Sequence, residues 1–376
     1  MENNTQCYEL TLTPNYVSDW TFNDAIRELI QNGTDQEILD KSNKFSIDYD
    51  YKSKTLRLTN TKSKLKINTL LLGGSSKSDN EDTVGQFGEG YKIAALVLNR
   101  IGKSFTIYNN ERNEVWTSKF KNSEKWLEKI LAFYVEKVPT PNGGLVIEVG
   151  NVTEDEYDSL CDTWIGFYDD LEKIKTTYGD ILLDEEMQNK IFVNGLAVEC
   201  SADMEYGYDF KPKYIKLERD RKTYDWWNAG DITSKMISDS MLDGGIEFEI
   251  VEHLVESNSD DVRNLEFNTH LGSVKEAQKR LIESFDKQHE KPYSIPVREQ
   301  SDIDVIKAYG GNPVVVPYKV ANLLKDETSK RIQELITAPV GKSLTLKERF
   351  QRWYDAYSSK LGDGARQELA ELINEV

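Results

Sequence analysis

Residues 73–90 form a polar segment with five glycines that leads directly into an apolar run, residues 92–98. The segment cannot bury a core, so we expect a loop, whereas the run is a good helix former. Glycine lets a backbone approach a ligand closely, and exposed amides at a helix start attract anions. The G-x-x-G-x-G spacing of residues 85–90 matches neither the dinucleotide fingerprint nor a Walker P-loop. A phosphate-binding helix start and a flexible turn before a helix both remain open for this segment alone.

A second segment, residues 19–41, is predicted to be a helix because its apolar residues recur at helical spacing. At about 100° per residue, Glu28, Asn32 and Asp35 fall within about 60° of one another. Gly33, in the middle, costs a helix about 1 kcal/mol relative to alanine, which indicates a packing or ligand reason. The three polar side chains look into the same space, although an ordinary solvated helix face would have the same pattern.

The two segments offer the parts that phosphoryl transfer to water needs. These parts are a cation across the phosphates, amide donors around them and an acceptor for the water proton. Asn32 supplies a hard oxygen that suits Mg²⁺. Glu28, one turn away on the same face, is near enough to orient a water nucleophile. Closure of the loop would exclude bulk water and complete such a site.

Between these segments, residues 45–51 and 55–59 are predicted to form a hairpin, and residues 74–77 lie in the polar loop. The order is a helix with E-x-x-x-N-x-x-D, a hairpin, a polar loop and G-x-x-G-x-G-x-K at a helix start. This order resembles the GHKL ATPase superfamily, which shares the Bergerat fold and includes gyrase B subunits, MutL mismatch-repair proteins, 90-kDa heat-shock chaperones, MORC ATPases and sensor histidine kinases. The resemblance covers residues 20–150 and is closest in style to the gyrase, MutL, MORC and chaperone types.

The resemblance implies roles for individual residues. Glu28 matches the general base that polarises the attacking water, Asn32 the side chain that binds Mg²⁺, and Asp35 the acidic residue three positions on. Residues 143–148 resemble the family's last motif, in which a glycine, here Gly144, enters a strand under the nucleotide; the usual threonine is missing. The residues implied in the lid and the phosphate contacts are Lys77, Gly85, Gly88, Gly90 and Lys92.

The adenine end departs from the family's pattern. There, an aspartate in a D-x-G-x-G segment accepts a hydrogen bond from the adenine amino group, and the matching stretch here, residues 60–64, reads N-T-K-S-K. The oxygen of Asn60 can still accept from adenine, but its amide nitrogen can equally donate to a carbonyl. Base identity therefore stays open. Lys62 and Lys64 either add phosphate contacts or form a solvated basic turn.

Composition limits the partners. The 376 residues include 65 acidic and 47 basic ones, a formal charge of −18, so bulk attraction to nucleic acid or an anionic membrane is not expected. Cys7, Cys161 and Cys200 fit no zinc or disulfide framework and indicate a reducing compartment. No apolar run of about eighteen residues occurs, so we expect a soluble, cytoplasmic protein without a membrane partner.

The remaining segments suggest further elements. Residues 190–198 predict a strand, an Asn-Gly turn and a strand. They resemble the F-V-N-G stretch in the second domain of gyrase-like and MutL-like ATPases, although a hairpin inside the first domain would look the same. Residues 211–222 are basic and are expected to alternate as a strand, either as a paired surface ladder or with one cation that reaches the γ-phosphate, as the family's transducer lysine does. Phe350, Trp353 and Tyr357 share one helix face, either packed in a bundle or open to a partner.

These observations predict an α+β chain in three parts. They are a GHKL ATP-binding domain with the Bergerat α/β sandwich at 1–155, a transducer-like region at 156–290, and a C-terminal domain at 291–376 that begins with a strand, a helix and a strand and ends in helices. The expected function is Mg²⁺-dependent binding of ATP and its slow hydrolysis to ADP, coupled to a conformational switch or a homodimer. The alternative is a nucleotide-binding protein that does not hydrolyse and acts by binding a client protein. The presence of Glu28, without a convincing phospho-acceptor helix, argues against a histidine kinase.

Overall fold

The computed structural model describes residues 5–71, 90–140, 143–198, 202–215, 226–289, 293–337 and 345–375. The chain divides into two compact units. The first unit comprises residues 1–173, 182–200 and 207–225, and the second comprises residues 174–181, 201–206 and 226–376. The residues singled out for a nucleotide site belong to the first unit.

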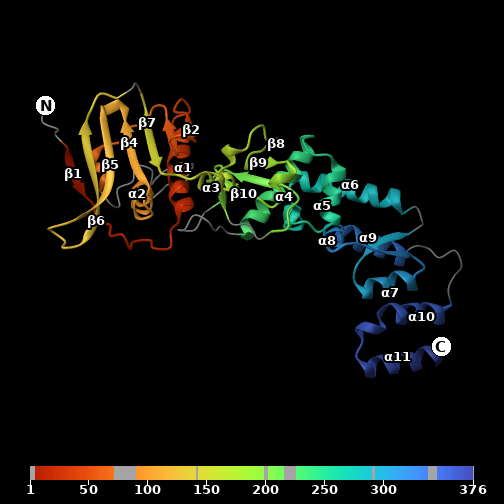
Figure 1. The fold of residues 1–376 in the computed structure, drawn as a ribbon. Helices are drawn as coiled ribbons and strands as arrows, with labels where there is room; N and C mark the ends of the chain where they lie inside the picture. Colours follow the sequence, from red (N-terminus) through yellow and green to blue (C-terminus); the bar gives the residue numbers. More distant parts are fainter. Residues whose placement is uncertain are drawn as a thin grey trace. The chain divides into compact units, whose positions relative to one another are not determined.

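The first unit is built on a seven-stranded sheet with the order β1-β6-β5-β4-β7-β3-β2 (Figure 1). All of its pairs are antiparallel, and β2 and β3 form the predicted hairpin. Alternation sets its two faces, because Leu56 and Leu58 of β3 are buried whereas Arg57 between them is exposed. The strands are β1 (Gln6–Glu9), β2 (Phe45–Asp50), β3 (Thr55–Asn60), β4 (Ser104–Asn109), β5 (Glu114–Asn122), β6 (Lys129–Lys137) and β7 (Leu145–Gly150).

Two helices, α1 (Phe22–Leu39) and α2 (Gly90–Arg100), contact each other and cover one face of this sheet (Figure 1). α1 begins where Thr21 and Asp24 form a capping box, and it lies within the predicted helix of residues 19–41. The apolar residues of both helices and of the inner sheet face make one core. The mixed α/β architecture with a large antiparallel sheet agrees with the α+β class expected from the sequence.

Short elements after β7 add to the same core. Leu160 and Leu196 are fully buried in it, and Trp164 packs against it. The first unit therefore extends beyond residue 155, and the two units differ from the three ranges expected from the sequence. The short helices of this unit are α3 (Glu154–Asp158), η1 (Ile67–Leu70), η2 (Asn110–Arg112), η3 (Cys161–Thr163), η4 (Ile165–Phe167) and η5 (Glu185–Met187).

The predicted strand, turn and strand near residue 194 is present. β10 (Ile191–Val193) and β11 (Leu196–Val198) pair antiparallel, and β10 also pairs in parallel with β12 (Gly207–Phe210). Asn194 and Gly195 at the turn have φ values of 52° and 77°, the left-handed conformation that an Asn-Gly hairpin turn requires. The hairpin lies in the first unit.

The second unit is mainly helical. Its two parallel strands, β13 and β14, are joined by α7, so the strand, helix and strand predicted near residue 300 are confirmed. Strands β8 and β9, which pair with each other in a different sheet, also lie largely in this unit. The elements are β8 (Lys173–Lys175), β9 (Gly179–Leu182), α4 (Trp226–Leu242), α5 (Phe248–Glu256), η6 (Asp260–Val262), η7 (Leu265–Asn268), α6 (Gly272–Gln288), β13 (Ser294–Val297), α7 (Gln300–Ala308), β14 (Asn312–Val315), α8 (Tyr318–Leu323), α9 (Lys325–Thr337), α10 (Leu346–Tyr357), η8 (Ser358–Lys360) and α11 (Asp363–Glu375).

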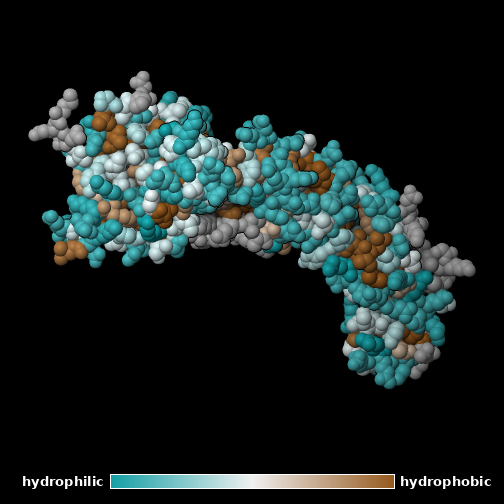
Figure 2. Space-filling model, viewed as in Figure 1, coloured by the Kyte–Doolittle hydropathy of each residue, from teal (hydrophilic) through white to brown (hydrophobic). Residues whose placement is uncertain are grey.

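The surface drawn in Figure 2 is mostly hydrophilic, with separate hydrophobic patches. On α10, Phe350 and Trp353 are each 41% exposed, whereas Ala356 on the same helix is buried. The aromatic face predicted for this helix is therefore only partly packed. Among the helices that the structure describes, none has the length and hydropathy needed to cross a bilayer.

Candidate functional site

α1 carries the three polar residues that the spacing placed on one helix face. Glu28 is only 7% exposed and Asp35 is fully buried, while Asn32 is half-buried. A solvated surface face, the alternative left open by the sequence, does not describe Glu28 or Asp35. Buried carboxylates are rare unless something nearby compensates the charge, so this side of α1 is a buried polar face rather than a solvated one.

Gly90, the first residue of α2, lies directly against Glu28 and Asn32. A Cβ atom built on Gly90 would be 2.8 Å from Asn32 Nδ2 and closer still to Glu28 Oε2. Real Cβ atoms do not approach other atoms so closely, so a side chain at residue 90 would force the ends of the Glu28 and Asn32 side chains to move. The structure thus brings the two segments of the sequence together: the start of one helix meets the carboxylate and the amide of the other.

The Asn32 amide has a defined orientation. Its Nδ2 donates to the Glu28 carbonyl at 2.8 Å, one turn earlier in α1. Its Oδ1 is therefore the atom that can accept a ligand, and an amide oxygen beside a carboxylate suits Mg²⁺. Within the described ranges, no group of three or more His, Cys, Asp or Glu side chains could hold a metal ion. The Glu28 and Asn32 pair fits a cation that takes most of its ligands from phosphate and water.

Asn60, at the end of β3, is tied to α1. Its Nδ2 donates to the Gly33 carbonyl at 3.0 Å, and the side chain is buried. Gly33 has a packing reason, because an added Cβ would lie within 2.8 Å of three atoms of the Phe45 ring. The absence of a side chain lets β2 and β3 approach α1 closely, and this approach brings Asn60 into hydrogen-bonding distance.

Gly144, at the entry to β7, meets the same residue from another side. Its φ is +75°, and an added Cβ would lie 2.8 Å from the Thr61 carbonyl oxygen and closer to that of Asn60. Both the backbone conformation and the space therefore require glycine. The structure thus places Gly144 against the backbone of Asn60 and Thr61.

Lys92 has a different environment from the one its position in the motif implied. It is fully buried, and its ammonium donates to the carbonyls of Thr69 at 3.0 Å and Leu71 at 2.5 Å. Next to it, the hydroxyls of Tyr91 and Thr69 share a hydrogen bond, and burial raises the pKa of Tyr91. Lys92 ties α2 to the η1 segment, so a phosphate contact would require its ammonium to leave these carbonyls.

Several candidate residues fall outside the described part of the chain. They are Lys77, Gly85 and Gly88, together with residues 216–222 of the basic segment. Its described part, residues 211–215, is a turn and a bend rather than the beginning of the expected strand. Near Asn60, the exposed Lys62 donates to Ser42 Oγ at 2.8 Å, as a solvated basic turn would.

Sequence reasoning missed the contacts that support α1 from the hairpin at residue 194. The Arg27 guanidinium donates to the Ala197 carbonyl, and Asn194 Nδ2 lies 3.5 Å from Thr34 Oγ1. The F-V-N-G stretch predicts a hairpin, but a hairpin motif does not indicate which helix the hairpin packs against. These two contacts place the hairpin beside the helix that carries Glu28 and Asn32.

Comparisons with known proteins give distant likenesses. No protein-family model matches the chain. An uncharacterized protein of Mycoplasma pneumoniae is 24% identical over 214 residues, which are 55% of this chain and 87% of that protein. The ATPase region of Saccharomyces cerevisiae topoisomerase II bound to ICRF-187 aligns over 47% of this chain with 12% identity and a TM-score of 0.33. The ATPase and transducer domains of DNA topoisomerase II from Balamuthia mandrillaris align over 51% with 11% identity and a TM-score of 0.31. The chain spans 62% and 66% of these two solved structures.

Proposed function

We propose that this protein binds ATP with Mg²⁺ and hydrolyses it slowly. The observation that carries the proposal is the contact of Gly90, at the start of α2, with the Glu28 carboxylate and the Asn32 amide. The start of a helix attracts phosphate, and a carboxylate with an amide oxygen suits a cation and a water. The start of α2 and the Glu28 and Asn32 side chains of α1, which are far apart in the sequence, thus lie next to each other in the structure. The order of motifs that resembles the GHKL ATPases supports the same function.

Each residue has a distinct task in the proposed reaction. The Glu28 carboxylate accepts a hydrogen bond from the attacking water and then its proton. Asn32 Oδ1 would hold the cation, which would neutralise charge on the phosphates. The backbone amide of Gly90, at the helix start, would donate to the phosphates. The burial of Glu28 limits its contact with bulk water, so its charge acts on the reacting groups with little screening.

The base end favours adenine. Asn60 Nδ2 is used by the Gly33 carbonyl, and a flipped amide would set two oxygens against each other. The oxygen of Asn60 is therefore the atom left for a base. Adenine offers an amino donor at the position where guanine offers a carbonyl acceptor. The asparagine thus serves as an acceptor, as the aspartate of the resembling family does.

Hydrolysis to ADP would act through a change in conformation or through a homodimer, as the resemblance implies. The exposed aromatic face of α10 is where a client protein could bind. The alternative is a protein that binds nucleotide without hydrolysis and acts through such a client. The departure at Asn60 from the family's aspartate motivates this alternative.

Titration calorimetry tests the binding part of the proposal. Wild-type protein should bind ATP in the presence of Mg²⁺ more tightly than GTP. Asn32→Ala should weaken ATP binding in Mg²⁺ but change it little in EDTA, because the lost oxygen acts through the cation. The proposal fails if wild-type protein binds neither nucleotide. The base assignment fails if GTP binds as tightly as ATP.

A further inference from the structure

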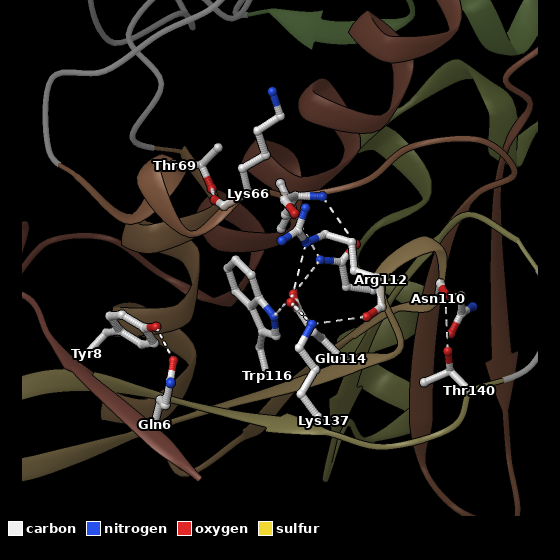
Figure 3. Close-up of polar contacts among 12 residues, drawn as sticks. Gln6, Tyr8, Lys66, Thr69, Asn110, Arg112, Glu114, Trp116, Lys137 and Thr140 are labelled. Atoms are coloured by element: carbon white, nitrogen blue, oxygen red, sulfur yellow. Dashed lines mark hydrogen bonds and ion pairs between the residues drawn. The ribbon is translucent and has the colours of Figure 1, made fainter. Parts of the chain in front are cut away.

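A buried carboxylate lies in the first unit outside the residues discussed so far. Glu114, the first residue of β5, has a side chain only 3% exposed and accepts from four donors (Figure 3). Its Oε1 accepts from Lys137 Nζ at 2.7 Å and from Arg112 Nε at 3.3 Å. Its Oε2 accepts from Trp116 Nε1 at 3.0 Å and from Asn109 Nδ2 at 3.1 Å. Every lone-pair direction of the carboxylate is used, so its position is strongly determined.

The neutral partner Asn109 connects the Glu114 carboxylate to a loop through hydrogen bonds. It is fully buried and lies opposite Glu114 in the register of β4 and β5. Its Nδ2 also donates to the Leu65 carbonyl at 2.9 Å, while its Oδ1 accepts from the Leu65 amide at 3.2 Å. One side chain thus satisfies both polar groups of a single loop residue. Glu114 sets the orientation of the amide, because Nδ2 must face the carboxylate.

Leu65 stands in the middle of residues 61–71, which we call the strap. The strap starts directly after Asn60, at the proposed base end of the site. It ends at Thr69 and Leu71, whose carbonyls accept from the Lys92 ammonium of α2. The strap therefore joins the base end to the helix that begins beside Glu28. Among the described residues, Asn109 is the only side chain of the sheet that hydrogen-bonds to Leu65.

We propose that Glu114 and Asn109 are positioning residues of the nucleotide site, which act by holding the strap at Leu65. The inference rests on the proposed function. Neither residue touches the proposed ligand positions at Glu28 or Asn32. Loss of the Glu114 charge removes the partner in the sheet that holds Asn109 Nδ2 in place, and the two hydrogen bonds that fix Leu65 then weaken. Nucleotide affinity falls because the base end and α2 are no longer held in one arrangement.

Glu114→Gln tests this role, because it keeps the shape of the side chain and places an N–H₂ group among four donors. Ser118→Ala is the matched control: Ser118 is also buried on β5, but its Oγ accepts from Asn99 near the end of α2, and no hydrogen bond of its side chain to the strap is present among the described residues. Two quantities are measured for each protein: amide hydrogen exchange of residues 61–71 without nucleotide, and the dissociation constant of Mg²⁺-ATP. Lys137→Ala, which removes an exposed donor to Glu114, serves if Glu114→Gln does not fold.

The expected result has two parts. In Glu114→Gln, the Leu65 amide exchanges faster and Mg²⁺-ATP binds about tenfold more weakly, the effect of one buried hydrogen bond to a charged group. Lys137→Ala changes both in the same direction by less, and Ser118→Ala changes neither. The inference is overturned if Glu114→Gln loosens the strap yet binds Mg²⁺-ATP as wild type does, or if the strap stays protected. If wild-type protein does not bind Mg²⁺-ATP, the proposed function fails first, and the inference falls with it.

Discussion

Gly33 and Gly90 show how a missing side chain shapes the first unit. Both lie on helices, where glycine lowers stability relative to alanine by about 1 kcal/mol. The structure supplies the reason in each case: the Phe45 ring stands where a Cβ of Gly33 would be, and Glu28 and Asn32 stand where a Cβ of Gly90 would be. The first is a packing reason and the second concerns the proposed site. Substitution of Gly33 therefore tests stability, whereas substitution of Gly90 tests the proposed site.

Gly33→Ala should destabilise the protein by about 1–3 kcal/mol, the usual effect of an overpacked core. The second substitution Phe45→Leu removes the ring edge that the new methyl group meets, so the double variant should recover part of the loss. The free energy of unfolding in urea measures both. Additive losses in the double variant would show that the ring is not the cause.

Gly90→Ala should lower the hydrolysis rate by about 100-fold, because the methyl group displaces the Glu28 carboxylate from its place. The substitution should not lower the melting temperature through helix propensity, because alanine is a better helix former than glycine. Gly272→Ala is the control, because a Cβ there meets nothing within 4 Å. Equal hydrolysis rates for Gly90→Ala and wild type would contradict the placement of the reaction beside this glycine.

Residue spacing predicted that Glu28, Asn32 and Asp35 share a helix face, but not that Glu28 and Asp35 are buried. The 3.6-residue period tells which residues point together; it does not tell which second element covers them. The buried position of Lys92 was not predicted for a related reason. Lysine is almost never fully buried, so no local pattern indicates an ammonium that binds two loop carbonyls.

Among the strands, β5 carries the clearest electrostatic signature. Burial raises the pKa of Glu114, but the hydrogen bonds from Lys137 and Trp116 outweigh it, so the pKa lies below its ordinary value. A carboxylate whose pKa is lower in the folded state adds stability above its unfolded pKa. This stability disappears as the pH falls through the folded pKa.

The free energy of unfolding of wild-type protein should therefore fall as the pH drops from about 5 to about 3, around the ordinary glutamate pKa. Glu114→Gln cannot titrate at this position, so it should be less stable at pH 7 and its acid-side slope should be shallower. Urea unfolding at several pH values measures both curves. Parallel slopes would show that Glu114 does not contribute to the acid sensitivity.

At the level of whole elements, periodicity predicted α1, the β2–β3 hairpin, the Asn-Gly hairpin at residue 194 and the β13-α7-β14 unit. These are local patterns with strong turn or cap signals. The strand expected from residue 211 is not present in its described part, because alternation over a few charged residues does not create a buried face. The hydrogen bonds that link Glu114, Asn109 and Leu65 join β5, β4 and the strap. No local sequence signal reveals such a contact.

For the molecule as a whole, the extent of the first unit is the main difference from the sequence-based ranges. Leu160 and Leu196 are fully buried in the core built by α1, α2 and the large sheet. A fragment that ends at residue 155 would lose both. Burying two such side chains contributes about 3–6 kcal/mol, a large part of the stability of a domain.

A fragment of residues 1–225 should therefore unfold in one cooperative thermal transition, whereas a fragment of residues 1–155 should not. Circular dichroism during heating compares the two. A fragment 1–155 as stable as the longer one would show that the first core does not need residues 156–225.

The proposal that Glu28 drives ATP hydrolysis is tested most directly by phosphate release under single-turnover conditions, with wild-type protein and Glu28→Gln compared in Mg²⁺-ATP. The glutamine keeps the shape and the buried position but cannot accept the proton of the water. Wild-type protein should release phosphate at least about 100-fold faster than the variant, while both bind ATP with the same affinity. Binding of ATP by both proteins, with no phosphate release by wild type above that of Glu28→Gln, would contradict hydrolysis and leave the nucleotide as a ligand alone.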